Sequence, residues 1–160
     1  MFTLVTIMKV HELFEAEERS ILSIMGKQPE RVDGTFYCSE ADFTSLEGAP
    51  SSVGGNFFAY SNKLTSLKGA PSSVGGNCYF NGNKLISLEG APSSIGGQLY
   101  CTSNKLTSLH NIHKQIKHIG VLANFEFNPI KSHVLGLLLI DGLRTIILDN
   151  REVAKIIIKH

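Results

Sequence analysis

The chain has 160 residues, of which 15 are Lys or Arg and 14 are Asp or Glu, so its net charge is +1. This balance disfavours a dedicated nucleic-acid or anionic-membrane protein, because such proteins carry a clear basic excess. Hydrophobic residues make up 42% of the chain, which is enough for a core and argues against wholesale disorder. The length predicts a single folding unit.

The N-terminal residues 1–33 predict a cap helix. Apolar residues recur there at helical spacing, and acidic residues occupy the other positions. The apolar set is Val10, Leu13, Phe14, Ile21, Leu22 and Met25, and Gly26 is the expected helix stop. The acidic polar face disfavours a helix that lies on a membrane surface. No secretory signal is recognised, so we expect a cytoplasmic protein that starts at Met1 or at Met8.

Residues 43–97 contain a block that repeats with a period of 21 residues. The block Phe43–Gly55 recurs as Leu64–Gly76 and as Leu85–Gly97, and a fourth copy begins at Leu106 and then diverges. Prolines align at 50, 71 and 92, and Gly-Gly pairs align at 54/55, 75/76 and 96/97; we attribute both columns to turns. Such a repeat predicts a solenoid, in which each coil stacks on its neighbours to close the core.

A strand pattern precedes each block. It has the form apolar-x-apolar-x-x-Asn-x-Leu and occurs at Phe57–Leu64, Cys78–Leu85 and Leu99–Leu106. Alternation along a strand points Phe57 and Ala59 inward, where Leu64, Leu67 and Val74 complete the core of a coil. The asparagines at 62, 83 and 104 are expected to bond backbone groups at the following turn.

This pattern matches the strand signature of a leucine-rich repeat. Over residues 34–130 the chain resembles the short bacterial leucine-rich repeats and uncharacterised repeat proteins encoded by tailed bacteriophages, which carry the same Leu-Glu-Gly-Ala-Pro block. The resemblance implies an α/β solenoid with a parallel β-sheet on its concave face.

Residues 131–160 predict a C-terminal cap. Ala123–Ile130 is a degenerate last strand, and Ser132–Ile140 predicts an apolar helix. Leu143–Leu148 fits a short strand or part of a helix, and Asp149 or Asn150 is the expected cap of a final helix through Ile158. Asp141 and Arg144 interrupt the most apolar stretch, residues 134–148, which is too short to span a membrane.

The outward strand positions form the candidate binding surface. Applying the period gives one aromatic column, and strands about 4.8 Å apart would stack its rings as a ladder. The candidate partner-binding residues are Tyr37, Phe58, Tyr60, Tyr79, Asn81, Tyr100 and Thr102. An amide-rich column at 35, 56, 77 and 98 precedes them. Aromatic side chains suit protein contacts, but cross-strand aromatics also stabilise a sheet without binding anything.

Three further groups of residues are interpreted as structural rather than functional. The lysines at 63, 84 and 105 fit a solvated edge better than a phosphate or acidic-partner site. The histidines at 110, 113 and 118 fit solvent-exposed positions better than a metal site, because no Cys or carboxylate completes the set. The cysteines at 38, 78 and 101 occupy inward columns and predict buried, free thiols.

No constellation of catalytic, metal-ligating or cofactor-binding residues is recognised, so we expect a non-enzymatic protein without catalytic residues, metal or cofactor. The favoured function is an interaction module that binds a partner protein through its concave β-face. The phage resemblance implies an inhibitor of a host protein, such as a defence protein. The alternative is a self-assembling repeat protein that forms a homodimer through its C-terminal cap. Nucleic-acid binding is disfavoured by the neutral charge.

Overall fold

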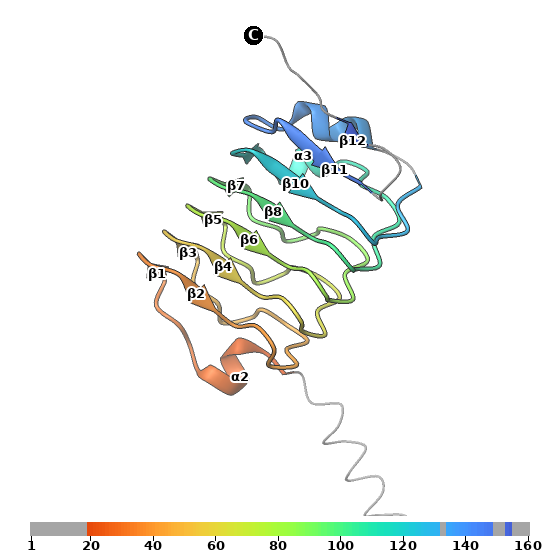
Figure 1. Ribbon diagram of the computed structural model, residues 1–160. Coiled ribbons are helices and arrows are strands. Elements are labelled where there is room, and N and C mark those ends of the chain that lie inside the picture. Colours follow the sequence, from red (N-terminus) through yellow and green to blue (C-terminus); the bar gives the residue numbers. More distant parts are fainter. Residues whose placement is uncertain (1–18, 132–133, 149–152, 155–160) are drawn as a thin grey trace, which may run out of the picture.

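The computed structural model describes residues 19–131, 134–148 and 153–154. These residues form a parallel β-solenoid, in which successive coils stack along one axis (Figure 1). Each of the first four coils contributes one strand to each of two sheets. The helices are short: α2 (Ile21–Met25), α3 (Ile112–Gln115) and the 3₁₀ helix η1 (Val134–Leu139).

A five-stranded parallel sheet forms one side of the solenoid. Its strands are β1 (Arg31–Val32), β3 (Ser52–Val53), β5 (Ser73–Val74), β7 (Ser94–Ile95) and β9 (His118–Ile119), in that spatial order. The sequence pattern had suggested a single sheet. The second residue is the only apolar one in each strand: Val53, Val74, Ile95 and Ile119 are buried, and Val32 of β1 is partly buried. Such short strands leave little alternation to recognise in the sequence.

A seven-stranded sheet forms the neighbouring side. Its strands are β2 (Phe36–Tyr37), β4 (Phe57–Phe58), β6 (Cys78–Tyr79), β8 (Leu99–Tyr100), β10 (Leu122–Asn124), β11 (Thr145–Ile147) and β12 (Val153–Ala154). All neighbours pair in parallel except β11 and β12, which are antiparallel. Equivalent residues of successive repeats pair directly, as Phe57 does with Cys78 and Cys78 with Leu99.

The core lies between the two sheets, and the residues predicted to form it are buried. Phe57, Ala59, Leu64 and Leu67 are fully buried and Val74 almost so. Fully burying an aliphatic or aromatic side chain contributes about 1.5–3 kcal/mol, and the period supplies the same set in every coil.

The Gly-Gly pairs lie at bends between two strands, as predicted, for example between β3 and β4, but these bends do not use left-handed backbone. Gly54, Gly75 and Gly96 have no positive φ; they lie where one coil touches the next. A Cβ at Gly96 would sit 2.3 Å from the carbonyl oxygen of Gly75. The left-handed turn belongs instead to the glycine before each Ala-Pro, for example Gly69 with φ +86°.

The N-terminal cap differs from the single helix expected. Ser20 has extended backbone (φ −88°, ψ 162°), and its side chain accepts the N–H of Ser23, so Ser20 is the N-cap at which α2 begins. One continuous helix through Ile21 is therefore wrong, although Gly26 (φ +76°) ends α2 as predicted. Of the apolar set, Ile21 is buried, while Leu22 and Met25 are exposed. Val10, Leu13 and Phe14 lie outside the described residues.

The described part of the C-terminal cap combines the 3₁₀ helix η1 with the strands β11 and β12. The strand predicted within Ala123–Ile130 is found as β10, with Ala123 and Phe125 buried, but it is not the last strand, because β11 and β12 follow it in the same sheet. The expected α-helix at Ser132–Ile140 is the 3₁₀ helix η1, and Leu143–Leu148 contains a strand. A final helix is wrong at Val153–Ala154, where β12 continues the sheet. Because β11 pairs with β10 and β12 pairs with β11, backbone N–H and C=O groups along these strands are hydrogen-bonded. A helix packed at the same place would leave the groups at the strand edge without partners. Asp149, Asn150 and Ile158 lie outside the described residues.

Candidate functional site

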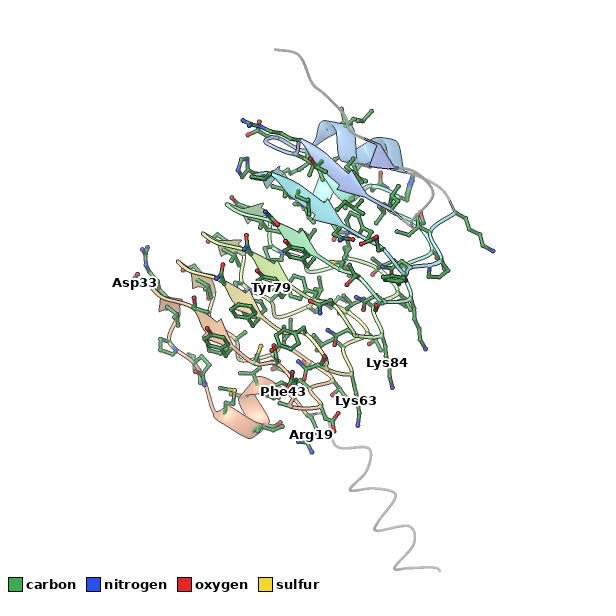
Figure 2. The ribbon with its side chains drawn as sticks, viewed as in Figure 1. Arg19, Asp33, Phe43, Lys63, Tyr79 and Lys84 are labelled. Carbon is green, nitrogen blue, oxygen red and sulfur yellow. The ribbon has the colours of Figure 1, made fainter. Side chains whose placement is uncertain are left out.

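Four aromatic rings stack in one continuous ladder on the outer face of the seven-stranded sheet (Figure 2). The ring centroids of Tyr37 and Phe58 are 4.8 Å apart, those of Phe58 and Tyr79 4.5 Å, and those of Tyr79 and Tyr100 4.9 Å. The rings are within 10° of parallel. The strand register places them directly opposite one another, as the period predicted. We call these four residues the aromatic ladder.

The inner rings of the aromatic ladder present their edges rather than their faces to solvent. Phe58 and Tyr79 each have a ring on both sides, and both are half-buried. Tyr37, at the end of the row, is 66% exposed. At the other end the next partner of Tyr100 is Asn124, which is buried and ends the aromatic column.

A column of side-chain amides, Asn56, Asn77 and Gln98, makes hydrogen bonds beside the aromatic ladder. Asn56 Oδ1 accepts the N–H of Asn77 at 2.8 Å, and Asn77 Oδ1 accepts the N–H of Gln98 at 2.8 Å. Asn77 Nδ2 then donates to the hydroxyl of Tyr79 at 3.1 Å. The hydroxyl of Tyr100 donates to Gln98 Oε1. The amides thus link neighbouring coils and orient two of the rings, a role that their spacing alone did not indicate.

The remaining candidate residues lie on the other side of the aromatic ladder. Tyr60, Asn81 and Thr102 follow β4, β6 and β8 and are half-buried. The ring of Tyr60 meets Phe58 edge-on at 6.2 Å and 87°. The structure therefore gathers all seven candidate residues on one face, and no charged residue lies in its three columns between residues 35 and 102.

A buried asparagine column fixes the turn behind this face, as predicted. Asn83 Oδ1 accepts the N–H of Leu64 at 3.1 Å, and its Nδ2 donates to the carbonyls of Ala59 and Phe80 at 2.9 and 3.1 Å. Asn62 and Asn104 make equivalent bonds, and Asn128 repeats them in the degenerate coil. Because each asparagine joins two coils, the column holds the ladder strands in register.

The lysine column lies on an exposed edge away from the aromatic ladder (Figure 2). Lys63 forms an ion pair with Asp42 at 3.2 Å, in which both side chains are about half exposed. Exposed pairs of this kind contribute about 0–1 kcal/mol. The geometry fits the predicted solvated edge.

The histidines and cysteines gather into no cluster that could hold a metal among the residues that the structure describes. His110 is exposed as expected, but His113 and His118 are only half-exposed. His118 Nδ1 lies 3.0 Å from Asp141 Oδ2, a contact that the sequence did not predict. This contact joins β9 to the segment after η1.

All three cysteines are buried and free, as predicted. Burial raises the pKa of the Cys38 thiol to about 12. Burial likewise raises the pKa of Cys78 and of Cys101 well above the usual value. A nucleophilic cysteine needs the opposite shift, so the burial of these thiols disfavours nucleophilic chemistry at them.

The comparisons with known proteins return no relative. No family model matches the chain, and neither a curated protein nor a solved structure matches it. Within the described part of the chain, no helix has the length and apolar character needed to cross a membrane.

Proposed function

We propose that the chain is a leucine-rich repeat solenoid that binds a partner protein through the aromatic ladder and the polar columns beside it, without catalysing a reaction. The observation that carries this function is the aromatic ladder itself: four stacked rings, with Tyr37 exposed, in columns that carry no charge between residues 35 and 102. The buried Asn-x-Leu columns support the repeat assignment, because they follow the strand signature of that family.

The geometry of the face favours binding at a low entropic cost. Stacking and the bonds from Asn77 and Gln98 already restrict the rotamers of Tyr79 and Tyr100. Ordering free side chains on binding costs about 0.5–1.5 kcal/mol each, so rings held in place beforehand lose less. Tyr is also enriched among the residues that dominate the affinity of protein interfaces.

The exposed ring edges indicate what the partner presents. Because neighbouring rings cover each other's faces, contacts fall on edges and phenol hydroxyls, beside the amides at 56, 77 and 98. Ring edges carry partial positive charge and meet aromatic faces or carbonyl oxygens favourably. An uncharged partner surface with aromatic side chains and backbone carbonyls fits best. The resemblance to phage-encoded repeat proteins supports a host protein, such as a defence protein, in the cytoplasm.

The test is affinity capture from bacterial lysate with mass spectrometry. Wild type is run beside Tyr79→Ala/Tyr100→Ala and beside Ile86→Ala, which removes an exposed apolar side chain outside the ladder columns. Circular dichroism must show that all three proteins are folded. A protein captured by wild type and by Ile86→Ala, but lost with the double variant, supports the proposal. Equal capture by wild type and both variants contradicts it.

A homodimer is the second candidate. Leu138 and Leu139 of η1 are both exposed. This 3₁₀ helix lies towards the C-terminal end of the solenoid (Figure 1). Exposed apolar side chains that lie together favour an interface. Light scattering after size exclusion distinguishes the two functions, because a monomer over a wide concentration range excludes the dimer.

A further inference from the structure

The coil that follows the aromatic ladder places a carboxylate near its last ring. β10 lies beside β8 (Figure 1), and the strand register puts Asn124 opposite Tyr100. Glu126 comes two residues later on the same face and continues the column of residues 60, 81 and 102. The three outward columns carry no charge from residue 35 to residue 102, so Glu126 is the first charged side chain along this face.

Asn124 holds this carboxylate in one orientation. Its Nδ2 donates to Glu126 Oε2 at 3.0 Å, and its Oδ1 accepts the backbone N–H of Glu126 at 2.9 Å. Asn124 is itself buried, whereas Glu126 is half-buried. No basic side chain among the described residues forms an ion pair with Glu126. The carboxylate is therefore oriented, and the described part of the chain supplies no cation for it.

The core of the solenoid does not require this carboxylate. The degenerate coil keeps the buried columns of the repeat, because Ala123, Phe125 and Asn128 are all buried. Its outward positions differ from those of the earlier coils. Besides Glu126, the left-handed position that is Ser or Gly at 61, 82 and 103 holds Phe127, with φ +58° and 66% of the residue exposed. Bulky side chains are unusual in this conformation, and such positions cluster at ligand-binding sites.

A partner that covers the aromatic ladder also removes water from Glu126. The loss of water from a carboxylate is costly unless a positive charge takes the place of the water. A carboxylate accepts about four hydrogen bonds, so Glu126 Oε2 can accept another beside the one from Asn124. A guanidinium suits this site better than an ammonium group, because its planar fork bonds both oxygens of a carboxylate.

We propose that Glu126 is the ionic anchor of the binding face and pairs with one basic side chain of the partner, arginine in preference to lysine. This inference rests on the proposed function, and it adds the charge and the place of one partner group. The neutral and aromatic surface of the partner covers the rings, and its basic group lies at the C-terminal end of the aromatic ladder. A single charge at one end fixes the direction in which the partner lies along the strands.

The test is selection from a random library of short displayed peptides, which needs no known partner. Wild type, Glu126→Gln and Tyr79→Ala/Tyr100→Ala are selected in parallel, after circular dichroism has shown that they are folded. Glu126→Gln removes the charge but keeps an oxygen that can accept the hydrogen bond from Asn124. Glu40→Gln is the matched control, because it removes an exposed carboxylate that follows β2, at the opposite end of the aromatic ladder.

The expected result separates the charge from the rings. Wild type and Glu40→Gln should enrich peptides that carry aromatic residues and one basic residue at a fixed spacing from them. Glu126→Gln should keep the aromatic preference and lose the basic one. By calorimetry, Glu126→Gln should bind the most enriched peptide about tenfold more weakly than wild type does. The same peptide with glutamine in place of its basic residue should bind both proteins equally.

The opposite results distinguish the anchor from the proposed function. Aromatic enrichment without a basic residue in wild type overturns the anchor and leaves the proposed function standing. A basic preference that survives Glu126→Gln, or that disappears with Glu40→Gln, also overturns the anchor. Enrichment that is unchanged in Tyr79→Ala/Tyr100→Ala, or absent from wild type altogether, contradicts both the proposed function and the anchor that rests on it.

Discussion

A Cβ added at Gly75 would lie 2.2 Å from the carbonyl oxygen of Gly54, in the preceding coil. The obstructing atom is backbone, which is held by the hydrogen bond from the N–H of Gly75 to the carbonyl of Val53 at 2.8 Å. The short distance between stacked coils therefore requires glycine in this column. The glycines let two backbones approach to a separation that no side chain permits.

Gly75→Ala should consequently destabilise the protein by more than the 1–3 kcal/mol typical of overpacking, because the backbone must move rather than a side chain. Urea unfolding followed by circular dichroism measures the loss. Gly34→Ala is the matched control. Gly34 lies in the first coil, in the column of Gly55 and Gly76, and a Cβ added there would meet nothing within 4 Å. We expect Gly34→Ala to change stability by less than about 0.5 kcal/mol. Equal losses in the two variants would refute the stacking argument.

Asn83→Ala should be among the most damaging polar substitutions. It deletes an acceptor for the N–H of Leu64 and a donor to the carbonyls of Ala59 and Phe80, all in the buried interior. Each buried group left unsatisfied costs about 1–3 kcal/mol, so we expect a total loss of about 3 kcal/mol or more. Asn81→Ala, two residues earlier on the half-exposed face, should cost less than 1 kcal/mol in the same urea titration. A loss at Asn81 that matches the loss at Asn83 would contradict this assignment.

The repeated columns could be predicted from the sequence because each was present in several copies. Asn62, Asn83 and Asn104 lie where the period placed them, and so do the four rings of the aromatic ladder. One strand and its register define the same position in every coil. The identical spacing of the copies then fixes which side chains become neighbours.

The segments present in one copy were predicted less well, for physical reasons that differ. Ser20 interrupts the expected helix because its side chain and that of Ser23 cap each other's backbone, a local competition that apolar spacing does not reveal. Thr145–Ile147 is a strand because β10 offers it a parallel partner, which is tertiary information. The strands of the five-stranded sheet have two residues each, too few for an alternating pattern to be seen.

The buried thiols make stability depend on pH in the alkaline range. Burial raises the pKa of Cys38 from 9.0 to about 12, and it raises the pKa values of Cys78 and Cys101. The contribution of the three protonated thiols to the free energy of unfolding is fully present below pH 9. Above it the unfolded chain loses protons that the folded chain keeps, so stability falls as pH rises towards 12. At pH 9.5 the loss is about 1 kcal/mol per thiol.

Urea unfolding at pH 7.5 and 9.5 measures this loss. Cys38→Ala is the control, and the difference between its free energies at the two pH values should be smaller than that of wild type by about 1 kcal/mol. A thiol reagent at pH 8 provides a second measurement: labelling should require unfolding by urea. Rapid labelling of the native protein would show that the thiols are accessible.

The position of a ring within the aromatic ladder should determine its contribution to stability. Tyr79 stacks on Phe58 and Tyr100 at 4.5 and 4.9 Å, whereas Tyr37 stacks only on Phe58. Stacked aromatic pairs contribute about 0.5–1.5 kcal/mol beyond the area that they bury, and leucine keeps apolar bulk while removing the stack. We therefore expect Tyr79→Leu to lower the free energy of unfolding by about 1–3 kcal/mol, roughly twice the effect of Tyr37→Leu.

Urea unfolding of the two leucine variants checks this ratio. Both losses are smaller than the 5–15 kcal/mol that typically holds a domain together, so both variants should remain folded and usable in the capture experiment. Equal losses would mean that stacking contributes little and that the rings act one by one. A large loss at Tyr79 with no loss of partner capture would assign the aromatic ladder to stability of the sheet rather than to binding.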